Sequence, residues 1–144
     1  MLAIIRPDNW NFPLFLHVLG ATLVTGATAA AFITALSSRR WPWMRLVMAR
    51  TLLLATFPAW ILMRLAGAWI ESREDISGSP GWLGVGFIVG DGGLLLLVVA
   101  MILGALGVRR PQRNWPVGAV AVLTGVYFVA LIVAMVAMTG KPGS

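Results

Sequence analysis

Four long apolar stretches constrain this chain more than any other feature of its sequence. They cover residues 12–36, 51–70, 83–107 and 115–138, and each reaches the roughly 20 residues that a helix needs to cross a bilayer. Short polar connections separate them, which favours antiparallel neighbours. A mean hydropathy of +0.88 and a charged fraction of 11% exclude a soluble globular domain. We therefore predict an all-α membrane protein, a four-helix antiparallel transmembrane bundle that forms one membrane domain over residues 1–144.

Basic residues gather in two of the three connections between these stretches. The first and third connections carry Arg39, Arg40, Arg45, Arg50, Arg109, Arg110 and Arg113, and the middle one carries Glu71, Arg73, Glu74 and Asp75. Because positive residues concentrate on the cytoplasmic side of a membrane, loops 37–50 and 108–114 are predicted to be cytoplasmic and both termini to lie outside. This placement explains the net charge of +6 without nucleic acid as a partner. We predict a multi-pass protein of the cytoplasmic (inner) membrane, surrounded by the lipid bilayer.

The second apolar stretch contains a proline and a tryptophan away from its ends. Pro58 cannot donate a backbone hydrogen bond, and its ring clashes with the carbonyl of Leu54, so a kink is expected there. A structural kink is favoured over a functional hinge. Trp60 is the one tryptophan inside a span, and ordinary packing is its simplest interpretation.

Ionisable side chains within the apolar stretches are the main candidates for function, because an unpaired charge in hydrocarbon is costly. Arg64 lies seven residues before Glu71, which at ~1.5 Å per residue puts its backbone about 10 Å below the outer boundary. Asp91 lies eight residues after Leu83, about 12 Å below the same boundary. Helix side chains lean toward the helix N-terminus, so these two lean toward each other in antiparallel spans. We predict a buried ion pair between Arg64 and Asp91, able to form two parallel hydrogen bonds.

Three interpretations of this pair remain open. The pair can lock the second and third spans in register, or it can form a ligand or proton site. Alternatively, Arg64 can extend toward Glu71, which lies near the same face of its helix. A pair sealed inside the bundle would favour the structural role, and a pair that lines a wet pocket would favour binding.

His17 and Tyr127 are further polar side chains of the spans. His17 lies five residues after Phe12, about 7 Å below the outer boundary, and Tyr127 lies near mid-membrane. We predict that one ligand-binding pocket, open to the outside, is surrounded by Arg64, Asp91, His17, Glu71 and Tyr127. For His17 an interfacial or hydrogen-bonded role is favoured over a metal ligand. With no cysteine and one histidine, the sequence predicts no metal site and no catalytic residue.

The segment from Phe15 to Ala21, FLHVLGA, resembles the first helix of bacterial membrane proteins related to the copper-resistance protein D family and its small uncharacterised four-span relatives. The stretches 62–74 and 82–91 also resemble such small proteins. Because some distant relatives bind haem or handle metals through histidines, the resemblance implies a haem ligand at His17 alone. This chain has no second histidine, so methionine, lysine, water or a second subunit would have to supply the other ligand.

Four functions compete for this sequence. We favour a small membrane protein that binds a ligand or cofactor, or acts as an accessory subunit of a membrane complex, through the outer-half polar cluster. The first alternative is a small transporter or proton-linked carrier in which Asp91 changes protonation beside Arg64, and four spans favour a homo-oligomer in that case. The second is a haem-binding redox protein with His17 as ligand. An enzyme is supported least, since the chain has no cysteine, no credible serine nucleophile with a histidine and no metal motif.

Overall fold

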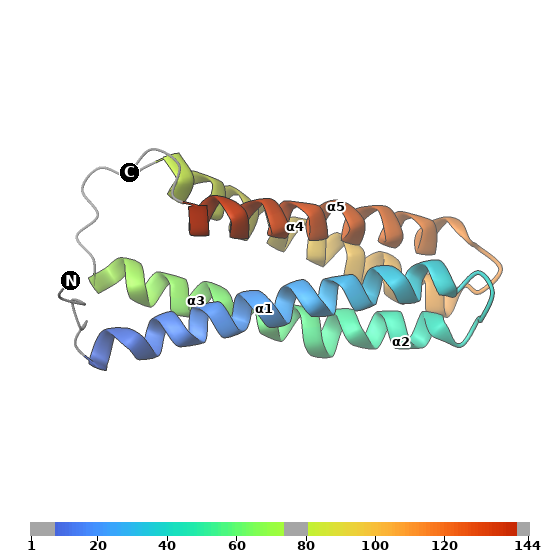
Figure 1. The fold of residues 1–144 in the computed structure, drawn as a ribbon. Helices are drawn as coiled ribbons and strands as arrows, with labels where there is room; N and C mark the ends of the chain where they lie inside the picture. Colours follow the sequence, from blue (N-terminus) through green and yellow to red (C-terminus); the bar gives the residue numbers. More distant parts are fainter. Residues whose placement is uncertain (1–7, 74–80, 141–144) are drawn as a thin grey trace.

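The computed structural model describes residues 8–73 and 81–140, and the regular structure within these ranges is entirely helical (Figure 1). The elements are α1 (Asp8–Ser37), α2 (Met44–Thr51), the π-helical turn η1 (Leu52–Thr56), α3 (Phe57–Arg73), α4 (Gly81–Arg109) and α5 (Trp115–Gly140). Because α2, η1 and α3 follow one another without a break, they form one span. The helices long and apolar enough to cross a membrane are Phe12–Ser37, Met44–Arg73, Gly84–Arg109 and Trp115–Gly140. The prediction of a helical protein with four helices long and apolar enough to span a membrane is confirmed.

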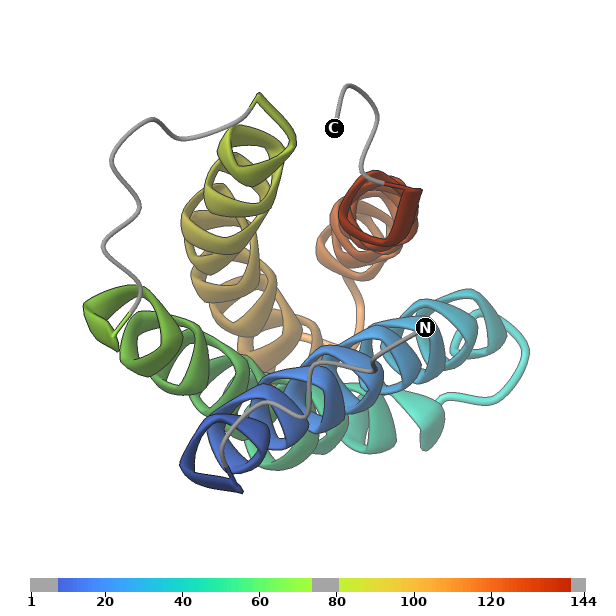
Figure 2. The same cartoon turned by 60° about the vertical axis from the view of Figure 1, so that its left-hand side comes forward.

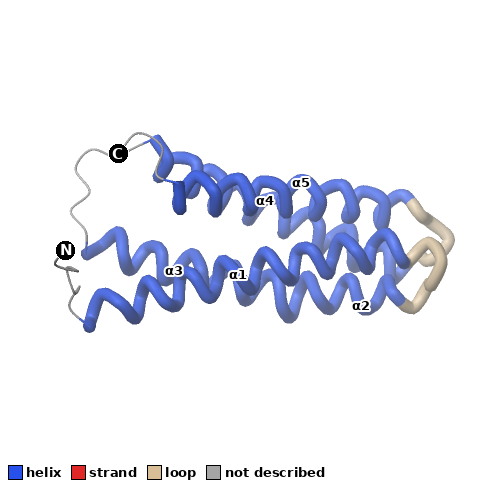
Figure 3. The backbone as a smooth tube through the Cα atoms, in the orientation of Figure 1, coloured by secondary structure: helices blue, strands red, loops and turns tan. Residues whose placement is uncertain are grey.

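The two ends of the bundle differ in charge. At the basic end, residues 38–43 and 110–114 form the loops that connect successive spans (Figure 3), and both loops contain arginines in the sequence. At the acidic end, α1 begins at Asp8 and the last turn of α3 contains Glu71. Successive spans run in opposite directions between these two ends, as expected of an antiparallel bundle (Figure 1).

The second span begins at Met44 rather than at residue 51, so the expected loop 37–50 is wrong. Its last part is α2, and residues 38–43 alone make the connection. The arginines at 45 and 50 suggested a loop, because charged residues usually mark the end of a span. Arg50 is exposed, but Arg45 turns inward and is only 8% exposed. The terminal nitrogens of Arg45 make the hydrogen bonds described below, whereas its buried Nε has no hydrogen-bond partner among the described residues.

Where a kink was expected near Pro58, the structure has a π-helical turn, η1, that ends two residues before the proline. In this turn, the N–H of Phe57 donates to the carbonyl of Leu52, five residues earlier. The hydroxyl of Thr56 donates to the carbonyl of Thr51 at 3.2 Å. Pro58 lacks the N–H that a regular α-helix would use here, and the wider turn accommodates that loss. The second span therefore stays continuous through its proline.

Close helix packing holds three sides of the bundle together. α1 packs against α3 and α5, and α4 packs against α5 (Figure 2). A Cβ added to Gly20 of α1 would lie 2.6 Å from the backbone nitrogen of Met63, so the backbones of α1 and α3 almost touch there. The fourth side differs: α3 and α4 pack together much less, and their ribbons separate toward the acidic end.

One cluster of buried side chains runs along the interior of the bundle, with members from every span. Its largest fully buried members are Val24, Met48, Leu52, Leu97, Val120 and Tyr127. Thr28 and Thr124 are also buried, and their hydroxyls donate to carbonyls one turn earlier, at 2.6 Å and 2.7 Å. These bonds satisfy the hydroxyls without water, as an apolar surrounding demands.

Candidate functional site

Arg64 of α3 and Asp91 of α4 lie side by side across the loosely packed side of the bundle. The Nε of Arg64 donates to Oδ1 of Asp91 at 2.8 Å. The guanidinium carbon also lies 5.7 Å from the ring centre of Phe87, one turn before Asp91, in a cation–π arrangement. Both residues fall within helices that are apolar enough to span a membrane. The structure thus places in contact the two side chains that depth and side-chain direction had matched.

The pair is not buried, which corrects the expectation of a buried ion pair. The side chains of Arg64 and Asp91 are 32% and 57% exposed. Gly90 and Gly93 face the interior, and at about 100° per residue Asp91 falls on the opposite side of α4. Because α3 and α4 pack so little against each other, neither helix covers the pair. One hydrogen bond joins the two side chains, although an arginine and an aspartate can form two parallel bonds.

A second polar contact joins α3 to α4 beside the ion pair. Nε1 of Trp60 donates to the carbonyl of Gly90 at 2.8 Å, one helical turn from Arg64. Trp60 therefore makes a hydrogen bond to the neighbouring span, whereas ordinary packing had been expected of it. We call Trp60, Arg64, Phe87, Gly90 and Asp91 the α3–α4 seam. Since α3 and α4 share little other packing, these contacts are the main connection between them at this level.

His17 lies in the interface between α1 and α3 rather than at the seam. Its Nδ1 is 2.9 Å from the carbonyl oxygen of Met63, and the half-buried ring lies against Gly67, where a Cβ would come 3.1 Å from Nδ1. A carbonyl only accepts, so Nδ1 carries the hydrogen in this bond. Nε2 is thus the nitrogen left to bind an iron if this chain takes up haem. The geometry itself is that of a hydrogen bond between two helices.

Among the described residues, Tyr127 and Glu71 make no hydrogen bond or ion pair with Arg64 or Asp91. Tyr127 is 1% exposed and packs against Gly93 of α4, whose missing side chain makes room for the ring. Its hydroxyl has no hydrogen-bond partner among the described residues. Glu71 is exposed near the acidic end, and the described residues show no ion pair between it and Arg64. Of the five side chains expected around one pocket, only Arg64 and Asp91 are joined by a contact in this part of the chain.

Arg45 is a buried arginine that the sequence had placed in a loop. Its Nη1 donates to the carbonyls of Gly107, Pro111 and Arg113 at 3.2, 2.9 and 3.4 Å, and its Nη2 donates to Oδ1 of Asn114 at 2.6 Å. These acceptors lie at the end of α4 and in the loop after it, where helix carbonyls lack partners and the helix dipole favours a cation. Arg45 therefore ties the second span to the third. Its sequence neighbourhood does not distinguish it from exposed Arg50.

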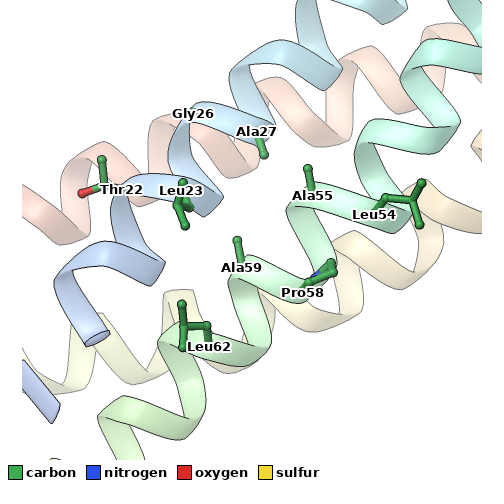
Figure 4. A pocket seen from close by; sticks show the side chains of 9 residues that line it. All are labelled: Thr22, Leu23, Gly26, Ala27, Leu54, Ala55, Pro58, Ala59 and Leu62. Carbon is green, nitrogen blue, oxygen red and sulfur yellow. The ribbon is translucent and has the colours of Figure 1, made fainter. Parts of the chain in front are cut away.

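An apolar groove of about 510 Å³ lies between α1 and the second span (Figure 4). Its lining consists of Thr22, Leu23, Gly26, Ala27, Leu54, Ala55, Pro58, Ala59 and Leu62. The Thr22 hydroxyl is already bonded to the carbonyl of Val18 at 2.9 Å. With no charged lining residue, the groove suits an apolar chain rather than a polar ligand, and it shares no residue with the α3–α4 seam.

Two further observations bear on the function of this chain: its potential metal ligands and its similarity to known proteins. Within residues 8–73 and 81–140, no group of three or more histidine, aspartate or glutamate side chains is placed to hold a metal ion. Comparisons with protein-family models, curated proteins and solved structures find no match for this chain. The resemblance to relatives of the copper-resistance protein D family therefore stays a prediction from the sequence.

Proposed function

We propose that this chain is a non-catalytic membrane protein that acts by binding, as a ligand-binding module or as an accessory subunit of a membrane complex, through the α3–α4 seam. The exposure of Arg64 and Asp91 within apolar spans carries this proposal. Charged groups open to hydrocarbon are strongly unfavourable, so a ligand or partner that covers them gains interaction energy. A pair that serves only to staple two helices is expected to be sealed between them.

The hydrogen-bonding capacity of the pair also supports a binding role. A guanidinium has five N–H donors, and only the Nε–H of Arg64 bonds to Asp91. Within the described residues, Oδ2 of Asp91 and both terminal nitrogens of Arg64 make no further hydrogen bond. The seam therefore presents donors and acceptors side by side, at a level of the membrane where water is scarce.

Native mass spectrometry of protein released from membranes tests this proposal. We expect wild-type protein to carry additional non-covalently bound mass, and the double variant Arg64→Met with Asp91→Leu to lose it. The double variant removes both charges together, so it strands no unpaired ion and is expected to fold with little loss of stability. Arg50→Met, which removes an exposed arginine outside the seam, should keep the bound mass.

Equal bound mass on wild type and on a double variant with unchanged helical circular dichroism would assign the seam a purely structural role. The reversed pair, Arg64→Asp with Asp91→Arg, sharpens the distinction. It keeps an ion pair between α3 and α4 but inverts the charge at each position. A staple tolerates this inversion, and so does a partner whose own charges invert with it, whereas a site for a charged ligand of fixed structure does not.

We further propose that the basic end faces the cytoplasm of a bacterium, with the chain in its inner membrane. The arginine-rich connections support this orientation through the positive-inside rule. Because the chain has no cysteine, single-cysteine variants report one position each. We expect a membrane-impermeant maleimide applied to spheroplasts to label Ser72→Cys and to leave Gln112→Cys unlabelled until the membrane is opened. The opposite labelling pattern would reverse the orientation.

The proton-linked carrier is a second candidate, favoured by one observation. The π-helical turn η1 interrupts the regular hydrogen bonding of the span that carries Arg64, and such turns recur at functional sites. In this hypothesis the turn lets α3 move relative to α4 while Asp91 gains and loses a proton. The bound-mass measurement separates the two candidates, because a carrier does not require a stably bound partner.

A further inference from the structure

The outward face of α4 carries a stripe of residues at regular spacing. They recur at alternating intervals of four and three, namely Gly84, Ile88, Asp91, Leu95, Val98 and Ile102. From Ile88 onward all of them are exposed, and Ile88 is exposed most, at 74%. A Cβ on Gly84 would meet nothing within 4 Å. A helix that pairs with another helix in a coiled coil has contact residues at this spacing.

One member of the stripe distinguishes it from an ordinary lipid-facing surface. α5 has an exposed face with the same spacing, made of Val122, Val126, Val129, Val133 and Val136. That face is apolar throughout and suits lipid. The α4 stripe instead has Asp91 at its centre, with a 57% exposed side chain and Arg64 beside it. In hydrocarbon, polar side chains on a helix surface promote helix association.

We propose that a second copy of this chain covers the stripe, so that α4 packs against α4 of the other copy and the two Arg64–Asp91 pairs merge into one four-charge cluster. This inference rests on the proposed function and names its partner. The exposed patch is self-complementary, since it carries one positive and one negative group. Each Arg64 can keep its bond to Asp91 of its own chain and direct its terminal nitrogens to Asp91 of the second copy.

Symmetry makes this pairing geometrically consistent. Most homodimers have a two-fold axis, and in a membrane that axis lies along the bilayer normal when both copies have the same orientation. Such an axis places equivalent residues at the same depth. Arg64 and Asp91 are already at the same depth because they touch within one chain, so Arg64 of one copy meets Asp91 of the other at that level. The four charges sum to zero.

Single-cysteine cross-linking in native membranes tests the pairing. We expect a mild thiol oxidant to join Ile88→Cys and Leu95→Cys into disulfide dimers at least about fivefold more efficiently than Val129→Cys. Val129 is the matched control, since it is exposed on α5 and lies as far from Trp115 as Leu95 lies from Arg109. Equal cross-linking at all three positions would overturn the inference, because it would reflect random collisions.

Charge variants in the Leu95→Cys protein test the four-charge cluster. Arg64→Met with Asp91→Leu is expected to lower the dimer yield about fivefold, whereas Arg64→Asp with Asp91→Arg should hold it within about twofold, because the reversed charges still alternate. If the uncharged variant cross-links as well as wild type, the cluster does not drive pairing and the inference is wrong.

The mass of the bound partner, measured by native mass spectrometry, distinguishes the proposed dimer from the broader proposal that the seam binds a ligand or partner. A second copy adds 15.4 kDa to the chain. If the seam variants lose bound mass that is not 15.4 kDa, the seam binds something other than this chain. The proposed function then stands and the inference fails. If wild-type protein carries no bound mass and the stripe does not cross-link, both fail together.

Discussion

Arg45→Met is expected to destabilise the folded bundle by about 2–4 kcal/mol, since each unsatisfied buried polar group costs about 1–3 kcal/mol. The substitution keeps an apolar stem as far as the position of Nε but removes every donor. The carbonyls at the end of α4 and Oδ1 of Asn114 then lose their common partner. Titration with sodium dodecyl sulfate in mixed micelles, followed by circular dichroism, measures the loss.

Arg50→Met provides the matched control for Arg45→Met. Arg50 lies on the same helix and carries the same charge, but it is exposed. It should change stability by less than about 0.5 kcal/mol, the usual range for surface substitutions. Equal losses in the two variants would mean that total charge, rather than the hydrogen bonds of Arg45, stabilises the basic end. Arg45→Lys should recover only part of the loss, because an ammonium cannot reach acceptors spread around a planar guanidinium.

Gly20→Ala is expected to destabilise the protein by about 2–3 kcal/mol, at the upper end of the cost of overpacking. The new methyl group would meet the backbone nitrogen and Cα of Met63, and backbone atoms cannot move aside as a flexible side chain can. α1 and α3 must therefore separate, which also lengthens the bond from His17 to the carbonyl of Met63. Unfolding in mixed micelles, followed by tryptophan fluorescence, reports the change.

Gly26→Ala separates crowding from helix propensity in the same helix. A Cβ at Gly26 would meet nothing within 4 Å, so alanine fits there. Alanine favours a helix over glycine by up to about 1 kcal/mol, and the variant should be neutral or slightly more stable. If Gly20→Ala behaves like Gly26→Ala, the close approach of α1 and α3 does not contribute to stability.

The contact between Arg64 and Asp91 could be anticipated because it depends on quantities that the sequence contains. Distance along a helix gives depth, and the direction of each span gives the lean of the side chain. The exposure of the pair could not be anticipated in this way. Burial depends on how closely α3 and α4 pack, which is decided by every other contact in the bundle. His17 and Tyr127 illustrate the same limit, since depth alone does not tell which neighbouring helix a side chain faces.

Arg45 and Trp60 show what the sequence pattern leaves out. Arginine next to a span is typical of a cytoplasmic loop, so composition gives no reason to bury Arg45. Its environment arises only when the end of α4 comes near and presents carbonyls without partners. Trp60 similarly gains its role from the carbonyl of Gly90, thirty residues later in the chain.

The sequence by itself determined the four spans, their alternating directions and the ion pair that joins two of them, because a bilayer selects apolar segments of one length and charges mark their ends. Only the tertiary structure decided which spans pack tightly. Gly20 brings α1 against α3 and Gly93 admits the Tyr127 ring of α5, whereas no comparable approach joins α3 to α4. The pair is therefore left open on the surface, because close packing in lipid depends on the shapes of facing helices and these meet only in the folded bundle.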